Sequence, residues 1–273
     1  LAQIQQINYR SPFIPSIKNY PSLLLMVNKN FKIVIEYDGI NFFGWQKQTD
    51  KKTIQGEIEK VLTLILSQEI KIIGSGRTDA GVHAFGQVAN FYADTNIGPQ
   101  KIKIALNSMI KDPIVIRECC IMDENFHARY NAVSKEYHYF ILNRQDPCAI
   151  ERLYQWHIRS PLDIEAMTQC CRAITGILDF KSFENTGSMR SSTIREVLFA
   201  SITRLDNQRV VFKICANGFL KYMVRNLIGT IVLVGLNKIS IDKFIQIVEA
   251  KDRTLAGATG PAHGLFLKKV NYS

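Results

Sequence analysis

A glycine-rich segment, Gly74 to Ala84, constrains the fold of this chain more than any other feature. Its sequence is GSGRTDAGVHA, and it lies between two apolar, strand-like runs, Ile70 to Ile73 and Val88 to Tyr92. Glycine accepts a positive φ and lets a ligand approach the backbone closely. We therefore predict a tight loop, held by two strands, that presents its polar side chains at the mouth of a sheet.

This loop carries one arginine and one carboxylate, Arg77 and Asp79. Residues two apart point to the same side of an extended segment, and a nearby guanidinium favours the ionised form of a carboxylic acid. We therefore expect Arg77 to keep Asp79 ionised, as a nucleophile or as an electrostatic group. The alternative is a solvated surface turn in which neither side chain has a chemical role.

The composition is that of a globular protein with a strong positive charge. The chain has 273 residues, of which 47% are hydrophobic and 21% charged, and its formal net charge is +10. These values fit one large domain or two modest ones, with a sizeable core either way. The basic balance suits a polyanionic partner, although a merely soluble basic protein would have the same composition.

Hydrophobic periodicity and turn signals predict both helices and strands. Hairpins together with crossover helices indicate an α+β fold with a largely antiparallel sheet, and Thr53, Asp163 and Ser240 are placed to cap helices. We expect helices over Ile54 to about Ser67, Lys101 to Met109, Pro161 to about Thr175, Phe219 to Val234 and Ser240 to about Lys251. We expect further strands over Phe31 to Tyr37, Pro113 to Arg117, Glu136 to Leu142, Glu196 to Arg204, Arg209 to Ala216 and Leu265 to Val270, a hairpin turn at Asp206 and Asn207, and a loop-rich insertion from Asp179 to Arg195 that includes Arg190.

The most apolar segment, Phe219 to Val234, is too short to cross a membrane and predicts a core helix. Arg225 lies in it among apolar neighbours. A buried arginine requires an acidic partner, because an uncompensated buried charge is strongly destabilising. Asp79 is the obvious candidate for that partner.

The chain divides into a leader and two halves. Residues 1–25 contain three prolines and no acidic residue, and we expect them to be a poorly ordered leader or extension, with the protein proper starting at Met26. The segment from Arg144 to Ile150 contains a proline and forms a natural junction. We therefore predict an N-terminal half, 26–143, and a C-terminal half, 144–273, with elements in similar order.

Neither the cysteines nor the histidines have the spacing of a metal site. The six cysteines include no CxxC pair and the five histidines no HExxH pattern. We expect reduced, buried thiols and no bound metal. A Walker A loop and a GxSxG nucleophile elbow are also absent from the sequence.

A series of short segments accompanies the glycine-rich loop in a fixed order. They are Tyr37-Asp38-Gly39, Phe42-Phe43-Gly44-Trp45-Gln46, Thr53-Ile54-Gln55-Gly56-Glu57, Gly86-Gln87-Val88-Ala89, Phe126-His127-Ala128-Arg129, Ser134-Lys135-Glu136-Tyr137-His138-Tyr139, Asn217-Gly218-Phe219 and Met223-Val224-Arg225-Asn226. Together with the GRTDAGVHA segment, which is far more specific than a lone GxGxxG, they resemble the TruA-type tRNA pseudouridine synthases. The resemblance runs from about Phe31 to Tyr272.

This resemblance implies an isomerase that converts uridine to pseudouridine at positions 38 to 40 of the tRNA anticodon stem-loop. It implies Asp79 as the nucleophile, with Arg225 holding it ionised and oriented. Arg77 would help to extrude the target base and would contact phosphate. Tyr137 would stack on that base, as aromatic side chains do on extruded bases, with its hydroxyl available for proton transfer.

The family also implies two similar halves with the active cleft between them and RNA lying across it. Arg129 and Lys135 are further candidates for substrate binding. Because the isomerisation needs no redox step and no external energy source, we expect no cofactor. We also expect a cytoplasmic homodimer with no membrane association.

Two other functions compete with this one. A non-catalytic RNA-binding protein could use the same scaffold, but it would have no need of Asp79, whose carboxylate would repel phosphate. A glycosidase usually needs two working carboxylates, and the only other candidates, Glu36 and Asp38, are not compellingly placed in the sequence.

Overall fold

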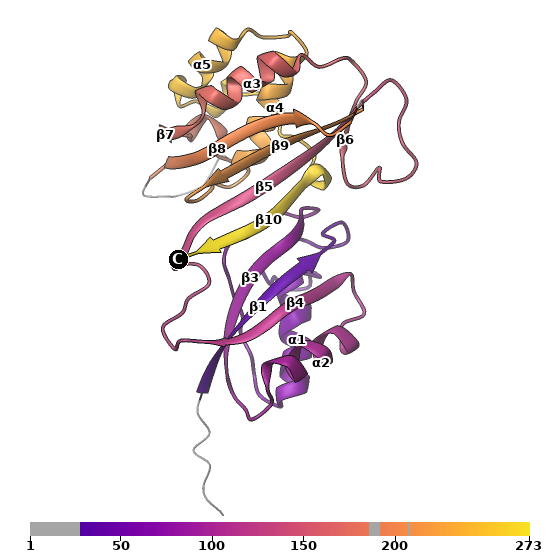
Figure 1. Ribbon diagram of the computed structural model, residues 1–273, viewed down its shortest axis with the longest axis vertical. Coiled ribbons are helices and arrows are strands. Elements are labelled where there is room, and N and C mark those ends of the chain that lie inside the picture. Colours follow the sequence, from indigo (N-terminus) through magenta and orange to yellow (C-terminus); the bar gives the residue numbers. More distant parts are fainter. Residues whose placement is uncertain (1–27, 186–191, 207) are drawn as a thin grey trace, which may run out of the picture.

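The structure is a computed structural model that describes residues 28–185, 192–206 and 208–273 (Figure 1). The predicted leader, the start at Met26, Arg190 and the Asn207 position of the expected hairpin turn lie outside these residues. The strands are β1 (Asn28–Tyr37), β2 (Ile73–Gly74), β3 (His83–Asp94), β4 (Ile114–Met122), β5 (Ala132–Asn143), β6 (Trp156–Ile158), β7 (Gly176–Asp179), β8 (Ile194–Arg204), β9 (Arg209–Ala216) and β10 (Leu265–Tyr272). The α-helices are α1 (Ile54–Leu66), α2 (Pro99–Met109), α3 (Ile164–Ala173), α4 (Met223–Gly235) and α5 (Ile241–Ala250), and short 3₁₀ turns occupy Lys181–Phe183, Arg253–Leu255 and Ala262–Gly264.

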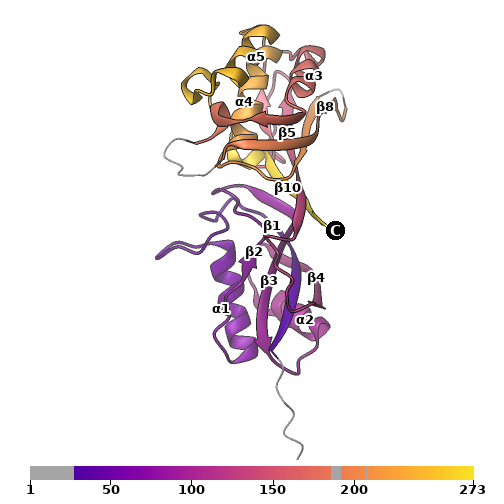
Figure 2. The ribbon, with the colours of Figure 1, turned by 90° about the vertical axis from the view of Figure 1, so that its left-hand side faces the viewer.

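All ten strands of the described ranges belong to one sheet. Its order is β4-β1-β3-β10-β5-β9-β8-β7, with β2 paired to β3 and β6 paired to β5. The pairing is antiparallel except between β10 and β3 and between β5 and β6. Helices α1 and α2 lie at the β1–β4 end, while α3, α4 and α5 lie at the β8–β9 end (Figures 1 and 2). The predicted α+β class with a largely antiparallel sheet is confirmed.

The last strand, β10, joins the two ends of this sheet. It runs between β3 and β5, so that Leu267 is opposite Ala84 on one side and Tyr137 on the other. The loop that precedes β3 is thereby brought beside the middle of β5, far along the sequence. The sheet is continuous across the boundary that we predicted between the two halves, 26–143 and 144–273. The division into these halves stays a prediction.

Local sequence signals explain where three helices begin. The side chains of Thr53, Asp163 and Ser240 each accept a hydrogen bond from the backbone N–H three residues later, at the start of α1, α3 and α5. Such caps satisfy backbone donors that have no partner within the helix. All three predicted caps are confirmed.

Several predicted boundaries are wrong. Helix α4 begins at Met223 rather than Phe219, because Tyr222 has a φ of 66° and cannot continue a right-handed helix. Only Ile73 of the predicted strand before the glycine-rich loop lies in β2. Strands β6 and β7 were not predicted, and β8 begins at Ile194, inside the expected insertion.

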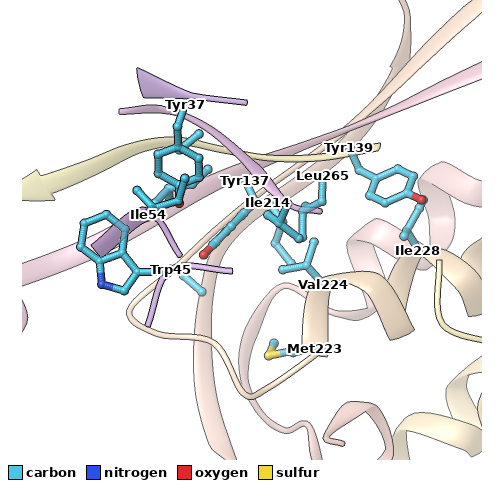
Figure 3. Packing of buried hydrophobic residues seen from close by; sticks show 14 of the residues in the cluster. Tyr37, Trp45, Ile54, Tyr137, Tyr139, Ile214, Met223, Val224, Ile228 and Leu265 are labelled. Carbon is cyan, nitrogen blue, oxygen red and sulfur yellow. The ribbon is translucent and has the colours of Figure 1, made fainter. Parts of the chain in front are cut away.

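The larger of two apolar clusters extends through the interior and reaches the glycine-rich loop from both ends of the sheet. In Figure 3, Tyr137 of β5 has Tyr37 and Trp45 to one side and Val224 of α4 to the other. Because protein interiors contain few voids, elements that pack on the same cluster cannot move independently of one another. The core therefore fixes the position of α4 relative to the loop that carries Asp79.

Candidate active site

The loop between β2 and β3 is shaped by close backbone contacts. A Cβ atom on Gly74 would lie 2.5 Å from the indole nitrogen of Trp45, so only glycine fits there. The backbone N–H of Trp45 donates to the Thr78 carbonyl at 3.1 Å. Gly81 has a φ of +78° in the turn that the Val82 N–H closes on the Asp79 carbonyl at 3.2 Å. The prediction of a tight loop held between strands agrees with this geometry.

Gln87, in β3, holds the same loop in place through side-chain hydrogen bonds. Its side chain is fully buried, accepts from the Ser75 hydroxyl at 2.7 Å and donates to the Gly76 carbonyl at 3.1 Å. The Lys135 ammonium group donates to the Ser75 carbonyl at 2.6 Å. No pattern in the sequence indicates this role of Gln87, although the segment Gly86-Gln87-Val88-Ala89 follows the glycine-rich loop closely.

Asp79 is paired with Arg225, from the first turn of α4. The Arg225 Nη1 donates to Asp79 Oδ2 at 3.2 Å, and its Nε donates to the Gly260 carbonyl at 2.8 Å. The guanidinium also lies 4.8 Å from the centre of the Tyr222 ring. The side chains of Asp79 and Arg225 are only 25% and 15% exposed. The predicted contact between these two residues, 146 positions apart, is confirmed.

Two opposing effects act on the Asp79 carboxyl group. Burial raises its pKa above the ordinary value, whereas the charges of Arg225 and Lys221 lower it, and burial is the larger effect. The expectation that Arg77 would keep Asp79 ionised is wrong. Arg77 is exposed and its Nε donates to the Gln46 side chain at 2.9 Å, so its guanidinium is engaged elsewhere.

Asp79 and Arg225 face a cleft of about 460 Å³. Its walls come from the glycine-rich loop, the turn before β5, β5 itself and the segment that leads into α4. Among the described residues that line it, Asp79 is the only acid, while the cations are Arg77, Arg129, Lys135, Lys221 and Arg225. A cleft with this balance attracts polyanions and concentrates them around one carboxylate.

Tyr137 forms part of the apolar floor of the cleft. It is 8% exposed, and its ring meets the Phe219 ring edge-on, with the centres 5.1 Å apart. Burial raises the pKa of its hydroxyl group, and the nearby Tyr37 and Asp79 raise it further. The structure therefore places Tyr137 beside Asp79 as a neutral phenol.

The two remaining predicted residues, Arg129 and Lys135, also line the cleft. Arg129 is exposed, whereas Lys135 is partly buried under the loop. Burial, with a smaller effect of Arg129, lowers the pKa of Lys135 to about 8. All the predicted site residues thus line one cleft, and Gln46 and Lys221 were missed because their contacts depend on distant segments.

The alternative carboxylates have other partners. Glu36 pairs with Arg117 at 2.7 Å on the surface. Asp38 accepts from the Ile40 N–H at 3.0 Å, as a turn residue does, and from the Tyr154 hydroxyl at 2.8 Å. Neither lines the cleft. A second carboxylate facing Asp79 is therefore absent from the described lining, which removes the basis for a glycosidase.

The described ranges contain neither a cluster of metal-ligating residues nor a membrane-spanning helix. No group of three or more His, Cys, Asp or Glu residues there could hold a metal ion. No helix there is long and apolar enough to span a bilayer. All six cysteines are free thiols; Cys170, Cys171 and Cys215 are buried, and the other three are partly exposed.

Comparison with known proteins gives the class to which this cleft belongs. The family model described as tRNA pseudouridine synthase matches residues 33–131 and 170–273. The protein named tRNA pseudouridine synthase A from Acetivibrio thermocellus is 43% identical over 244 residues, which cover 89% of this chain and 100% of that protein. Proteins of the same name from Thermoanaerobacter sp. and Caldicellulosiruptor bescii are also 43% identical, with the same coverage.

The chain therefore belongs to the tRNA pseudouridine synthase family. It is an isomerase that converts uridine to pseudouridine. The resemblance drawn from the short sequence segments is confirmed.

Proposed function

We propose that this enzyme modifies uridines at positions 38 to 40 of the tRNA anticodon stem-loop and that Asp79 is its nucleophile. The observation that carries the proposal is the isolation of Asp79. It is the only acid among the described residues of a cationic cleft, and Arg225 fixes its orientation. A carboxylate in such a place weakens phosphate binding, so a role in catalysis accounts for it better than a role in binding.

The reaction rearranges one bond without oxidation or reduction. The N1–C1′ bond breaks, the uracil ring turns, and a C5–C1′ bond forms. The hydrogen on C5 then leaves as a proton, and N1 gains one. Asp79 would attack either C6 of the base or C1′ of the ribose, and both routes begin with an ionised carboxylate.

The other side chains of the cleft have roles that follow from their positions. The target uridine must leave the RNA stack, which costs a few kcal/mol. Arg77, exposed at the rim, would fill the vacated space and contact phosphate. Tyr137, on the floor beside Asp79, would support the uracil ring. Arg129 and Lys135 would bind the backbone, because cations supply most of the affinity for RNA.

We also propose that the enzyme works as a homodimer in the cytoplasm, without a metal or a cofactor. Only the family resemblance supports the dimer. Sedimentation of the purified protein would test it directly.

Tritium release from tRNA labelled at C5 of uridine tests the reaction and the nucleophile together. We expect release by the wild type and a loss on the order of 10³-fold or more in Asp79→Asn, as when a nucleophile is removed. Affinity for tRNA should stay within a few-fold. Asp242→Asn is the matched control, because Asp242 lies in α5, outside the cleft lining.

The outcomes separate the competing functions. Full activity in Asp79→Asn would remove Asp79 from the mechanism. Tight tRNA binding with no release by the wild type would favour a non-catalytic RNA-binding protein. Mapping of the modified positions would decide between the anticodon stem-loop and other sites.

A further inference from the structure

The turn that leads into β5 holds a large aromatic side chain out in solvent. Tyr130 is 77% exposed, which is unusual for a tyrosine in a well-packed protein. One face of its ring stacks on His127, with the ring centres 4.2 Å apart and the planes 27° apart. The guanidinium carbon of Arg129 lies 5.8 Å from the centre of the same ring. All three residues line the wall of the cleft that contains Asp79.

Hydrogen bonds within the turn fix this pair of rings. The Nδ1 atom of His127 accepts from the N–H groups of Arg129 and Tyr130, both at 3.2 Å. The Asn131 side chain accepts from the His127 N–H at 2.6 Å. The imidazole is thereby held in place by the turn itself. The backing for Tyr130 is therefore a flat ring with a fixed orientation.

The turn is also anchored to the sheet. The buried Ala128 donates its N–H to Asn90 at 2.9 Å and accepts from the Tyr272 hydroxyl at 2.7 Å. A ligand that stacks on Tyr130 would thus meet a surface that is already in place. Preorganised surfaces bind more tightly because less freedom is lost on binding.

We propose that Tyr130, backed by His127, is a stacking platform for a nucleobase adjacent to the target uridine, and that Arg129 binds the phosphate between the two. This inference rests on the proposed function. It assigns Tyr130 to a second base because the target must reach Asp79, whereas Tyr130 is at the exposed rim and Tyr137 on the buried floor. Once a base leaves the stack, each of its two neighbours loses a stacking partner. Tyr130 would stack on one of these neighbours, while Arg77 fills the space that the extruded base vacates.

The charges around Tyr130 favour RNA over a protein partner. An exposed tyrosine beside an arginine is also typical of protein interfaces. Here, however, the platform belongs to a cleft whose described lining contains one acid and several cations. A polyanion with exposed bases fits both the charge and the ring.

The first test compares Tyr130→Ala with Tyr130→Phe. Affinity for tRNA is measured in an Asp79→Asn background, which keeps the RNA unmodified. We expect Tyr130→Ala to weaken binding by about 5- to 100-fold, the range for loss of one stacked base. Tyr130→Phe should restore most of the affinity, because the ring face is what binds. The melting temperature should not move in either variant, since Tyr130 is exposed.

Phe199→Ala is the matched control for loss of an exposed aromatic ring. Phe199 is 40% exposed on β8 and does not line the cleft. We expect its affinity for tRNA to equal that of the parent protein.

The second test uses tRNA with an abasic nucleotide on either side of the target uridine. If Tyr130 stacks on one of those bases, Tyr130→Ala should lose no further affinity with the RNA that lacks that base. An equal loss with every RNA would overturn the proposal. So would an unchanged affinity of Tyr130→Ala for the intact tRNA, or an equal loss in Tyr130→Phe.

Sedimentation, which measures the oligomeric state, distinguishes the stacking platform from a contact with another protein. A change of oligomeric state in Tyr130→Ala, with unchanged affinity for RNA, would place Tyr130 in a protein contact and refute the platform. Tritium release is measured separately from affinity. An inactive wild type would therefore count against the proposed function and leave the stacking test intact.

Discussion

At the scale of single residues, the ion pair between Asp79 and Arg225 joins the glycine-rich loop to α4 inside a cationic cleft. A charged residue in an apolar helix demands an opposite charge, and the glycine-rich loop offered one, so the pair could be inferred across 146 positions. Arg77 was assigned to Asp79 because the two are close in sequence. In the folded chain Arg77 donates to Gln46 instead, and no pattern along the chain indicates that contact.

Replacing Arg225 with methionine should change the pH dependence of catalysis. Arg225 opposes the effect of burial on Asp79, so its removal raises the pKa of Asp79 further. A carboxylate with a higher pKa is ionised only at higher pH, and the acidic limb of the pH–rate profile should therefore move to higher pH. Each unit of movement lowers the rate on that limb about tenfold. Single-turnover rates between pH 5 and 9 measure it.

Arg117→Met is the control for this variant. Arg117 is 59% exposed and pairs with Glu36 outside the cleft, so its loss should cost less than about 1 kcal/mol of unfolding free energy and leave the limb in place. Arg225→Met should lose more, about 1–3 kcal/mol, because it leaves the Gly260 carbonyl and Asp79 without a donor. An acidic limb that stays in place would contradict the role of Arg225.

At the scale of elements, capped helices were the easiest features to predict. Thr53, Asp163 and Ser240 mark helix starts through bonds to residues three positions away, so the signal is local. Strands β6 and β7 were missed because they are short and owe their pairing to β5 and β8. The start of α4 was misplaced because the apolar run begins before Tyr222, whose left-handed backbone has no signal in hydrophobicity.

The loop between β2 and β3 should depend on Gln87 for its shape. Gln87→Met would leave the Ser75 hydroxyl and the Gly76 carbonyl without their partner in a buried setting, at a cost of about 1–3 kcal/mol. Because these bonds fix the backbone beside Asp79, we expect the single-turnover rate to fall at least about tenfold even well below the melting temperature. Thermal unfolding and single-turnover assays measure the two effects.

Ser240→Ala separates loop geometry from general stability. It removes the cap of α5 and should cost about 1 kcal/mol, a similar destabilisation at a site outside the cleft. We expect its rate to match that of the wild type. Equal rates in Gln87→Met and Ser240→Ala would show that Gln87 acts on stability alone.

At the scale of the whole molecule, the chain has a net charge of +10, and several of its cationic side chains gather in the cleft. Composition indicates a polyanionic partner, but it cannot say where the partner binds. The continuous sheet indicates where it binds. Strand β10 lies between β3 and β5, so the glycine-rich loop, β5 and the segment leading into α4 line one cleft. Cations from three parts of the chain then meet around one carboxylate. This convergence depends on a topology that no local pattern reveals.

Salt dependence of tRNA binding tests whether the charge of the cleft, rather than that of the protein as a whole, binds the RNA. The logarithm of the affinity should fall linearly with the logarithm of the salt concentration. The slope of that line is proportional to the number of phosphates that the protein neutralises. Lys221→Gln, in the cleft, should reduce the slope by about 1. Lys238→Gln changes the net charge equally at an exposed position outside the lining, and its slope should match that of the wild type. Equal reductions in the two variants would mean that the overall charge attracts the RNA and that Lys221 makes no specific contact.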